Sequence, residues 1–394
     1  MTLTPETISL ADRRFVTDRY GTIEALRAQC FHARTPEGHV IFLDQEDVME
    51  VFRCERFRFT FNLIDADRSP YLAQAIEHEL LNLHGAAHAR LSALVKRALR
   101  ERVIDGLAEQ IDAIVARLID ALPAEGAFDV CEAIADPLPA RVLGPMFDVP
   151  YEDTAELNEW IRVGGRKLDA LQSGVGIDVV EGANRALHGY LRTLIQARRT
   201  AAGPDLFSEL VRADIDGDRM SEDELVFLSA ELAAAGVDTT RAQLPLIVNA
   251  LLDHPQQWQA LCETPELALR AVDEGMRFAP LPWVIPHSAT DAFDYKGIAF
   301  ESGDLVFCMV PAANRDPRVV PNPDRFDIRR DRVRHFGFGF GMHACPGLRL
   351  ARMEMASALT ALATRCPTLQ RSGPPEWAEG QVDRTLTALP VRTA

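Results

Sequence analysis

The sequence predicts a mainly α-helical protein with small β-sheets. Apolar side chains recur at the three- and four-residue spacing of helix faces through much of the chain. The segment Glu222–Asp253 is long and mostly apolar, so we expect a helix that crosses the whole molecule. Strand-like apolar runs are short by comparison, and they fall at Val40–Leu43, Ile285–Ala289, Leu305–Met309 and Leu386–Val391.

The helical elements follow from the spacing of apolar residues. From about His88 to Arg100, the apolar residues of one helix side are Leu91, Leu94, Val95 and Ala98. From Leu107 to Leu122, apolar residues recur at i, i+4, i+7 and i+8, which is one helix face. We expect Pro245 to kink the Glu222–Asp253 helix or to end it early, because proline lacks the N–H that the helix needs.

Composition and charge narrow the class of protein. Hydrophobic residues make up 47% and charged residues 25% of the chain, values typical of a globular protein with a large core. The net charge of −16 disfavours nucleic acid and anionic membranes as partners, because both are polyanions. Met1–Asp18 has no apolar run, and no stretch approaches the ~20 apolar residues of a membrane span. We therefore expect a cytoplasmic protein without a signal peptide, although length alone would predict two or three domains.

The cysteines are scattered and form no C-x-x-C pair. This pattern disfavours a disulfide framework and structural zinc, so most of them should be small core residues. The seven are Cys30, Cys54, Cys131, Cys262, Cys308, Cys345 and Cys366.

One cysteine has an unusual neighbourhood. Gly337, Gly339 and Gly341 alternate with phenylalanines ahead of Cys345, and such a run can turn tightly and approach a flat ligand. Pro346 then suits a first helical turn, which would leave Cys345 at a helix N-terminus where a thiolate is stabilised. A Cys/His protease pair or a metal knuckle is disfavoured, because His343 is only two residues away and no further ligands gather nearby.

A second unusual segment lies in the long apolar helix. It reads Ala-Ala-Ala-Gly-Val-Asp-Thr-Thr over residues 233–240, although a mid-helix glycine costs ~1 kcal/mol relative to alanine. A close helix–helix contact, with a threonine bonded back to a helix carbonyl, is the structural explanation.

Phe338-Gly339-Phe340-Gly341-Met342-His343-Ala344-Cys345-Pro346-Gly347 closely resembles the haem-binding loop of the cytochrome P-450 family. The resemblance extends over nearly the whole chain and implies a single domain, 1–394, with the haem between a long central helix and the cysteine loop. It makes Cys345 the thiolate ligand of haem b (iron protoporphyrin IX), with Phe338 and Gly347 also at the cofactor. A thiolate ligand pushes electron density through iron toward O₂ cleavage.

The helix motif resembles the oxygen-binding motif of the same family. By that resemblance Ala235 and Gly236 let O₂ and substrate approach the iron, and Asp238 and Thr239 deliver protons to the distal oxygen. Glu274 and Arg277 match the family's E-x-x-R pair, and Arg325 is expected as their third partner in a structural cluster.

Two residues depart from the family pattern for the haem propionates. Ser92 and His287 stand where the family often places arginines, and the expected propionate set is therefore His88, His287 and His343. The alternative for His88 and His287 is a satisfied core or helix-face histidine.

The resemblance implies a monooxygenase that inserts one atom of O₂ into a small, hydrophobic organic substrate. Apolar residues expected to line the pocket are Leu281, Trp283, Val284, Ile285 and Leu386. No flavin domain or iron–sulfur cysteine set is fused to the chain, so a separate ferredoxin or flavodoxin is implied as electron donor. A basic cluster that could dock it comprises Lys96, Arg97, Arg100, Arg102, Arg349 and Arg352, unless these residues form only a solvated helix face. A peroxide-dependent haem-thiolate oxygenase and a non-catalytic haem-binding or sensor protein are the alternative functions.

Overall fold

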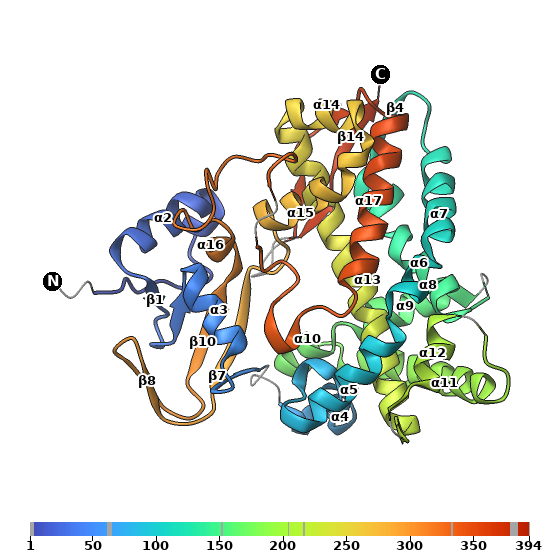
Figure 1. The fold of residues 1–394 in the computed structure, drawn as a ribbon, viewed down its shortest axis with the longest axis horizontal. Helices are drawn as coiled ribbons and strands as arrows, with labels where there is room; N and C mark the ends of the chain where they lie inside the picture. The colour runs from blue at the N-terminus through green and yellow to red at the C-terminus, as the bar shows by residue number, and fades with distance from the viewer. Residues whose placement is uncertain are drawn as a thin grey trace. The chain divides into compact units, whose positions relative to one another are not determined.

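The computed structural model describes residues 4–60, 65–150, 153–203, 205–215, 217–331, 334–378 and 385–393. The chain folds into two compact units that interleave in the sequence. Unit 1 comprises Met1–Thr60, Gln243–Cys345 and Cys366–Ala394, and unit 2 comprises Phe61–Ala242 and Pro346–Arg365. Helices dominate the ribbon and the sheets are small, so the predicted fold class is confirmed (Figure 1). The expected single domain, 1–394, stays a prediction.

Unit 1 is built on a five-stranded sheet of order β1-β2-β10-β7-β3. Its three inner strands are β2 (Val40–Phe42), β10 (Leu305–Met309) and β7 (Val284–Ala289), which confirms three of the predicted strands. The edge strands are β1 (His32–Arg34) and β3 (Phe57–Phe59). β2 and β10 run parallel, whereas the other pairs are antiparallel.

Both faces of this sheet bury apolar side chains, as the alternation of strand residues requires. One cluster gathers Phe42, Val306 and Cys308 around the buried Phe336, which immediately precedes the glycine-rich loop. The other gathers Ile41 and Met309 with residues of the N-terminal helices. Because Phe336 packs against the sheet, the sheet fixes the start of the loop that leads to Cys345.

The remaining elements of unit 1 are short. Its helices are α1 (Arg14–Thr17), α2 (Arg19–Gln29), α3 (Gln45–Arg53), α14 (Pro255–Glu263), η5 (Pro265–Leu267), α15 (Ala268–Phe278), α16 (Val310–Asn314) and η6 (Gly341–His343). Its other strands are β8 (Phe293–Tyr295), β9 (Ile298–Phe300), β11 (Gln370–Arg371), β12 (Glu376–Trp377), β13 (Leu386–Ala388) and β14 (Pro390–Thr393). The predicted strand Leu386–Val391 is thus two strands, since β13 pairs with β12 and β14 pairs with β11.

Unit 2 is helical. Its first helices are η1 (Ala66–Arg68), α4 (Pro70–Glu77), η2 (Leu80–Asn82), α5 (Gly85–Ala98), α6 (Glu101–Asp105), α7 (Ala108–Asp120), η3 (Cys131–Ala135) and α8 (Pro137–Phe147). They are followed by α9 (Thr154–Gly164), α10 (Lys167–Ser173), α11 (Ile177–Thr200), α12 (Leu206–Arg212) and α17 (Leu348–Arg365). Its strands are β4 (Gly126–Asp129), β5 (Asp214–Ile215) and β6 (Asp218–Arg219). The two amphipathic helices predicted near 88–100 and 107–122 are α5 and α7.

The long helix α13 (Glu222–Asp253) starts in unit 2 and continues into the residues of unit 1. It runs through Pro245 without a break, so the prediction that Pro245 could end it early was wrong. The side chains that follow, including Ile247, Val248 and Leu251, are fully buried. Their burial outweighs the backbone hydrogen bond that proline removes. Within the described ranges, no helix is long and apolar enough to span a membrane.

Candidate functional site

The loop that ends at Cys345 is held by close backbone approaches within unit 1. Gly339 and Gly341 adopt φ values of 65° and 71°, which glycine tolerates and other residues rarely adopt. A Cβ at Gly341 would overlap the carbonyl of Phe52 in α3. The Cys345 N–H donates to the Phe338 carbonyl at 2.9 Å and so closes the loop.

Asn314 anchors the start of this loop and was missed by sequence reasoning. Its side chain is fully buried, and its Oδ1 accepts from the Phe336 N–H at 2.7 Å. Its Nδ2 donates to the Met276 carbonyl at 3.4 Å. An amide at the end of the otherwise apolar helix α16 was the available signal, because a buried amide needs polar partners.

The end of the loop leaves apolar side chains uncovered. Cys345 is half-buried, whereas Met342 is 41% exposed and Leu348 is 36% exposed. Two large apolar side chains are therefore exposed within three residues of Cys345 in the sequence.

Two of the three expected propionate histidines share an aromatic neighbour in unit 1. The ring of Phe59 lies 6.0 Å from that of His287 and 6.1 Å from that of His343, centroid to centroid. His88 lies on α5 in unit 2, where burial lowers its pKa. Ser92, one turn further along α5, is also buried. The propionate roles of these histidines stay predictions.

The Glu274–Arg277 pair is buried and saturated with hydrogen bonds. Arg277 is fully buried, and its Nε and second terminal nitrogen each donate to the Glu274 carboxylate at 2.8 Å. The guanidinium also donates to the carbonyls of Pro323 at 2.8 Å and Arg325 at 3.2 Å. The pair therefore fixes the backbone of the segment that follows α16.

The third partner is Arg330, and the prediction of Arg325 was wrong. Arg330 Nε lies 3.2 Å from the Glu274 carboxylate, with only 11% of its side chain exposed. The Arg325 side chain is 66% exposed and pairs with Asp327 at 3.3 Å. Arg325 turns its carbonyl toward Arg277, so its side chain points away from the buried pair.

The motif on α13 is open on one side. Ala235 and Thr239, one helical turn apart, are exposed although the helix is otherwise largely buried. A Cβ added at Gly236 would meet nothing within 4 Å. The Thr239 hydroxyl donates to the Ala235 carbonyl at 2.5 Å, the back-bond that the structural explanation requires. The open side shows in addition that none of the described helices of unit 2 covers this turn.

The Asp238 side chain makes different contacts from the Thr239 side chain. Its Oδ1 accepts from the Arg241 guanidinium at 3.3 Å, and a Cβ at Gly165 would lie 2.8 Å from its Oδ2. Burial raises the pKa of this carboxyl, while Arg241 opposes the rise. The acid and the alcohol are thus adjacent in sequence but have different partners in this structure.

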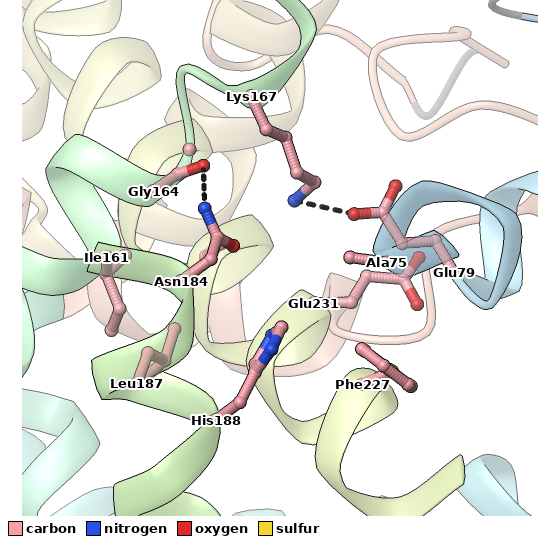
Figure 2. Close-up of a pocket in the computed structure, with 13 residues that line it drawn as sticks. Ala75, Glu79, Ile161, Gly164, Lys167, Asn184, Leu187, His188, Phe227 and Glu231 are labelled. Atoms are coloured by element: carbon pink, nitrogen blue, oxygen red, sulfur yellow. Dashed lines mark hydrogen bonds and ion pairs between the residues drawn. The ribbon is translucent and has the colours of Figure 1, made fainter. Parts of the chain in front are cut away.

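A small cavity in unit 2 lies beside the same helix (Figure 2). Figure 2 shows the Lys167 ammonium pointing toward Glu79, with the Glu231 carboxyl beside Glu79 and His188 further across the cavity. Lys167 Nζ lies 2.6 Å from the Glu79 carboxylate. Glu231 accepts from the N–H groups of Leu80 at 2.6 Å and Leu81 at 3.2 Å, and burial raises its pKa to about 8. Burial lowers the pKa of His188 to about 4. Burial therefore disfavours the charged forms of both groups, which limits the charge that the cavity carries.

The expected apolar pocket residues lie in unit 1 and differ in burial. Leu281, Val284 and Ile285 are half-buried, and Leu386 is 7% exposed. Trp283 is 2% exposed, with Phe15 against its ring at 5.5 Å and the Arg19 guanidinium over it at 4.0 Å. Trp283 is therefore a core side chain, and the prediction that it lines a pocket was wrong.

Comparisons with known proteins agree with this geometry. The family model for cytochrome P450 matches residues 178–375. The chain is 34% identical to the cytochrome P450 monooxygenase PikC of Streptomyces venezuelae, over 96% of this chain and 92% of that protein. It is also 34% identical to nocardicin C N-oxygenase of Nocardia uniformis, over 93% of each protein.

Solved structures lead to the same family. The structure of P450BioI, determined with a fatty-acyl carrier protein, superimposes with a TM-score of 0.89 at 27% identity over 97% of this chain and 100% of that one. The P450 PksS of Bacillus subtilis gives a TM-score of 0.88 at 28% identity, over 98% of this chain and 100% of that one. With relatives above 30% identity matched almost end to end, this chain belongs to the cytochrome P450 family and is a haem-thiolate monooxygenase.

Proposed function

We propose that Cys345 is the residue that binds the haem iron. The observation that carries this is the loop itself, in which two glycines with positive φ and one backbone hydrogen bond present a half-buried thiol. Cys308 and Cys366 fit less well, since burial raises the pKa of Cys308 far above the usual range and Cys366 is also buried. When bound, the haem supplies the iron that activates O₂.

The residues fit a flat apolar group. Met342 and Leu348 leave apolar surface uncovered near Cys345 in the sequence, and the Gly236 turn of α13 leaves space that a side chain would fill. Phe338 and Gly347 are half-buried, and Ala235 is exposed on α13. His287 and His343 each offer a ring N–H as a hydrogen-bond donor to a carboxylate, and His88 offers a third imidazole.

Asp238 and Thr239 carry the protons that oxygen reduction consumes. A carboxyl whose pKa is raised holds its proton at higher pH than an ordinary aspartate, which suits a proton donor. The Thr239 hydroxyl can accept a hydrogen bond while it donates to the Ala235 carbonyl, so it can orient a group bound against α13. For Asp238 to reach that group, it has to leave Arg241.

The substrate is a small hydrophobic organic molecule. The half-buried apolar residues Leu281, Val284 and Ile285 support this class. Named relatives include a polyketide-biosynthesis P450, a mycinamicin IV hydroxylase/epoxidase and an epothilone C/D epoxidase, which favours a molecule of this biosynthetic kind.

A separate ferredoxin or flavodoxin supplies electrons. Of the basic cluster, Arg349 already pairs with Glu101 and Asp105, both at 2.7 Å, and Arg100 pairs with Glu209 at 2.6 Å. Lys96, Arg97 and Arg102 are exposed and leave a smaller basic surface for an acidic partner.

A reconstituted assay tests this function. Candidate substrates are first screened by the change in iron spin state that they produce in the ferric enzyme. The best binder is then incubated with a ferredoxin, its reductase and ¹⁸O₂, and one labelled oxygen atom in the product is the expected result. Product that forms with hydrogen peroxide but not with the electron-transfer proteins would favour the peroxide-dependent alternative, and no oxidised product from any bound compound would favour a sensor.

A further inference from the structure

Arg241 lies between two carboxylates in unit 2, and it forms a short ion pair with neither of them. Its terminal nitrogens are 3.3 Å from Asp238 Oδ1 and 3.7 Å from Asp136 Oδ1. Tight charge-assisted hydrogen bonds are shorter, at about 2.7–2.9 Å. The Arg241 Nε is buried and makes no hydrogen bond. The guanidinium can therefore move toward either carboxylate.

A π-helical turn presents Asp136 to this arginine. The turn is η3 (Cys131–Ala135), and the Asp136 N–H donates to the Cys131 carbonyl at 2.8 Å, five residues back. Its neighbours Ile134, Ala135 and Leu138 are buried, whereas the Asp136 side chain is 53% exposed. A π turn rotates the following residues relative to a regular helix, and such turns recur at functional sites.

The other cations near Asp238 already have partners. Arg162 of α9 pairs with Glu159 at 2.6 Å, and Lys167 of α10 pairs with Glu79 at 2.6 Å. Both still favour the charged form of Asp238, but only through space. Because Gly165 has no side chain, Asp238 Oδ2 can lie against the end of α9. Arg241 is thus the cation whose position changes the charge balance at Asp238 most directly.

Asp136 competes for that cation. Burial raises the pKa of Asp136, and the carboxylates Asp129 and Glu132 raise it further, whereas Arg241 lowers it. The ionised form of Asp136 is stabilised when the Arg241 guanidinium moves closer to it. The same movement takes positive charge away from Asp238.

We propose that Asp136 is a positioning residue for the monooxygenase reaction: by sharing Arg241 with Asp238, it keeps Asp238 only loosely paired and so ready to hold and release a proton. The proposal rests on the proposed role of Asp238 in proton delivery. It adds a residue remote in sequence from the helix motif, and it assigns Arg241 the role of the shared cation.

The test measures the protonation of Asp238 directly in the resting ferric holoenzyme. The infrared carbonyl stretch of the protonated carboxyl is assigned by subtracting the spectrum of Asp238→Asn, and its loss is followed as pH rises. Arg241→Gln should raise the pH of half-protonation, because it removes the cation that favours the carboxylate. Asp136→Asn should lower that pH, because Arg241 is then left to Asp238 alone. Each shift should be about half a pH unit, the size expected for partly exposed ion pairs.

Controls separate sharing from a general charge or packing effect. Glu132→Gln removes the same charge next to Asp136 without freeing Arg241, and it should leave the Asp238 titration where it was. Arg241→Lys keeps the charge and should titrate closer to the parent than Arg241→Gln does. In the double variant of Asp136→Asn with Arg241→Gln, the titration should match Arg241→Gln alone.

An unchanged or raised half-protonation pH in Asp136→Asn would overturn the proposal. So would a double variant that keeps the shift of Asp136→Asn, since Asp136 would then act without Arg241. Failure of the proposed function looks different. If the infrared titrations shift as expected but the pH profile of product formed per electron consumed does not follow, Asp238 is not the proton donor, and the sharing of Arg241 still stands.

Discussion

Replacing Arg277 by methionine should cost more stability than any change to its arginine neighbours. The variant leaves the Glu274 carboxylate, 4% exposed, without its two 2.8 Å hydrogen bonds, and the Pro323 carbonyl loses its 2.8 Å hydrogen bond to Arg277. Breaking a buried ion pair from one side typically costs about 3–5 kcal/mol. We expect a loss of that size in the free energy of unfolding.

The two other arginines serve as matched controls. Arg330→Met removes the 3.2 Å contact with Glu274 and also the hydrogen bonds that Arg330 donates to the carbonyls of Pro321, Asn322 and Arg325. It should cost about 1.5–3 kcal/mol, as hydrogen bonds to charged groups do. Arg325→Met removes an exposed pair with Asp327 and should cost at most about 1 kcal/mol.

Urea unfolding of the three holoenzymes, followed by circular dichroism, measures the order. If Arg277→Met does not fold, Arg277→Lys takes its place with the same expected rank. A cost for Arg325→Met equal to or above that of Arg330→Met would refute the assignment of Arg330 as the third partner.

Three further results are expected. Thr239→Ala should consume reductant but release hydrogen peroxide in place of product, and Thr239→Ser should restore coupling; undiminished coupling in Thr239→Ala would remove the hydroxyl from the proton path. Haem retention should vary between about pH 6 and 8, where histidine titrates, and His287→Arg should flatten that dependence; identical curves would place His287 away from the propionates. Because burial raises the pKa of both Glu231 and Glu354 to about 8, the folded state favours their protonated forms. Their stabilising contribution is complete below the ordinary glutamate pKa and is lost as pH rises through about 8. Glu354→Gln should therefore reduce the fall in the free energy of unfolding over that pH window. An unchanged slope of the free energy of unfolding against pH would contradict the raised pKa of Glu354.

Local patterns in the sequence were sufficient for most of the fold. The spacing of apolar residues predicted α5, α7 and α13, and short strand-like apolar runs predicted the inner strands of the five-stranded sheet. The alternating glycines predicted a tight loop before Cys345, because positive φ is a property of the residue type and does not depend on distant contacts.

Features that depend on tertiary packing could not be predicted in this way. From the sequence alone, Arg325 and Arg330 are both expected to be surface residues. Only the course of the backbone decides which of the two side chains contacts Glu274. Trp283 was expected to line a pocket because it is large and apolar, but Phe15 and Arg19 from a distant segment enclose it. The spacing of apolar residues in the sequence does not indicate the π turn before Asp136.

The identity of the iron ligand is the central claim, and the spectrum of the reduced, carbon-monoxide-bound protein tests it most directly. The parent should show the strongly red-shifted Soret band of a thiolate-ligated haem. Cys345→Ala should lose that band, whereas Cys366→Ala, which removes a buried thiol elsewhere, should keep it. A thiolate band that survives in Cys345→Ala, or a parent band like that of a histidine-ligated globin in well-folded protein, would contradict the assignment.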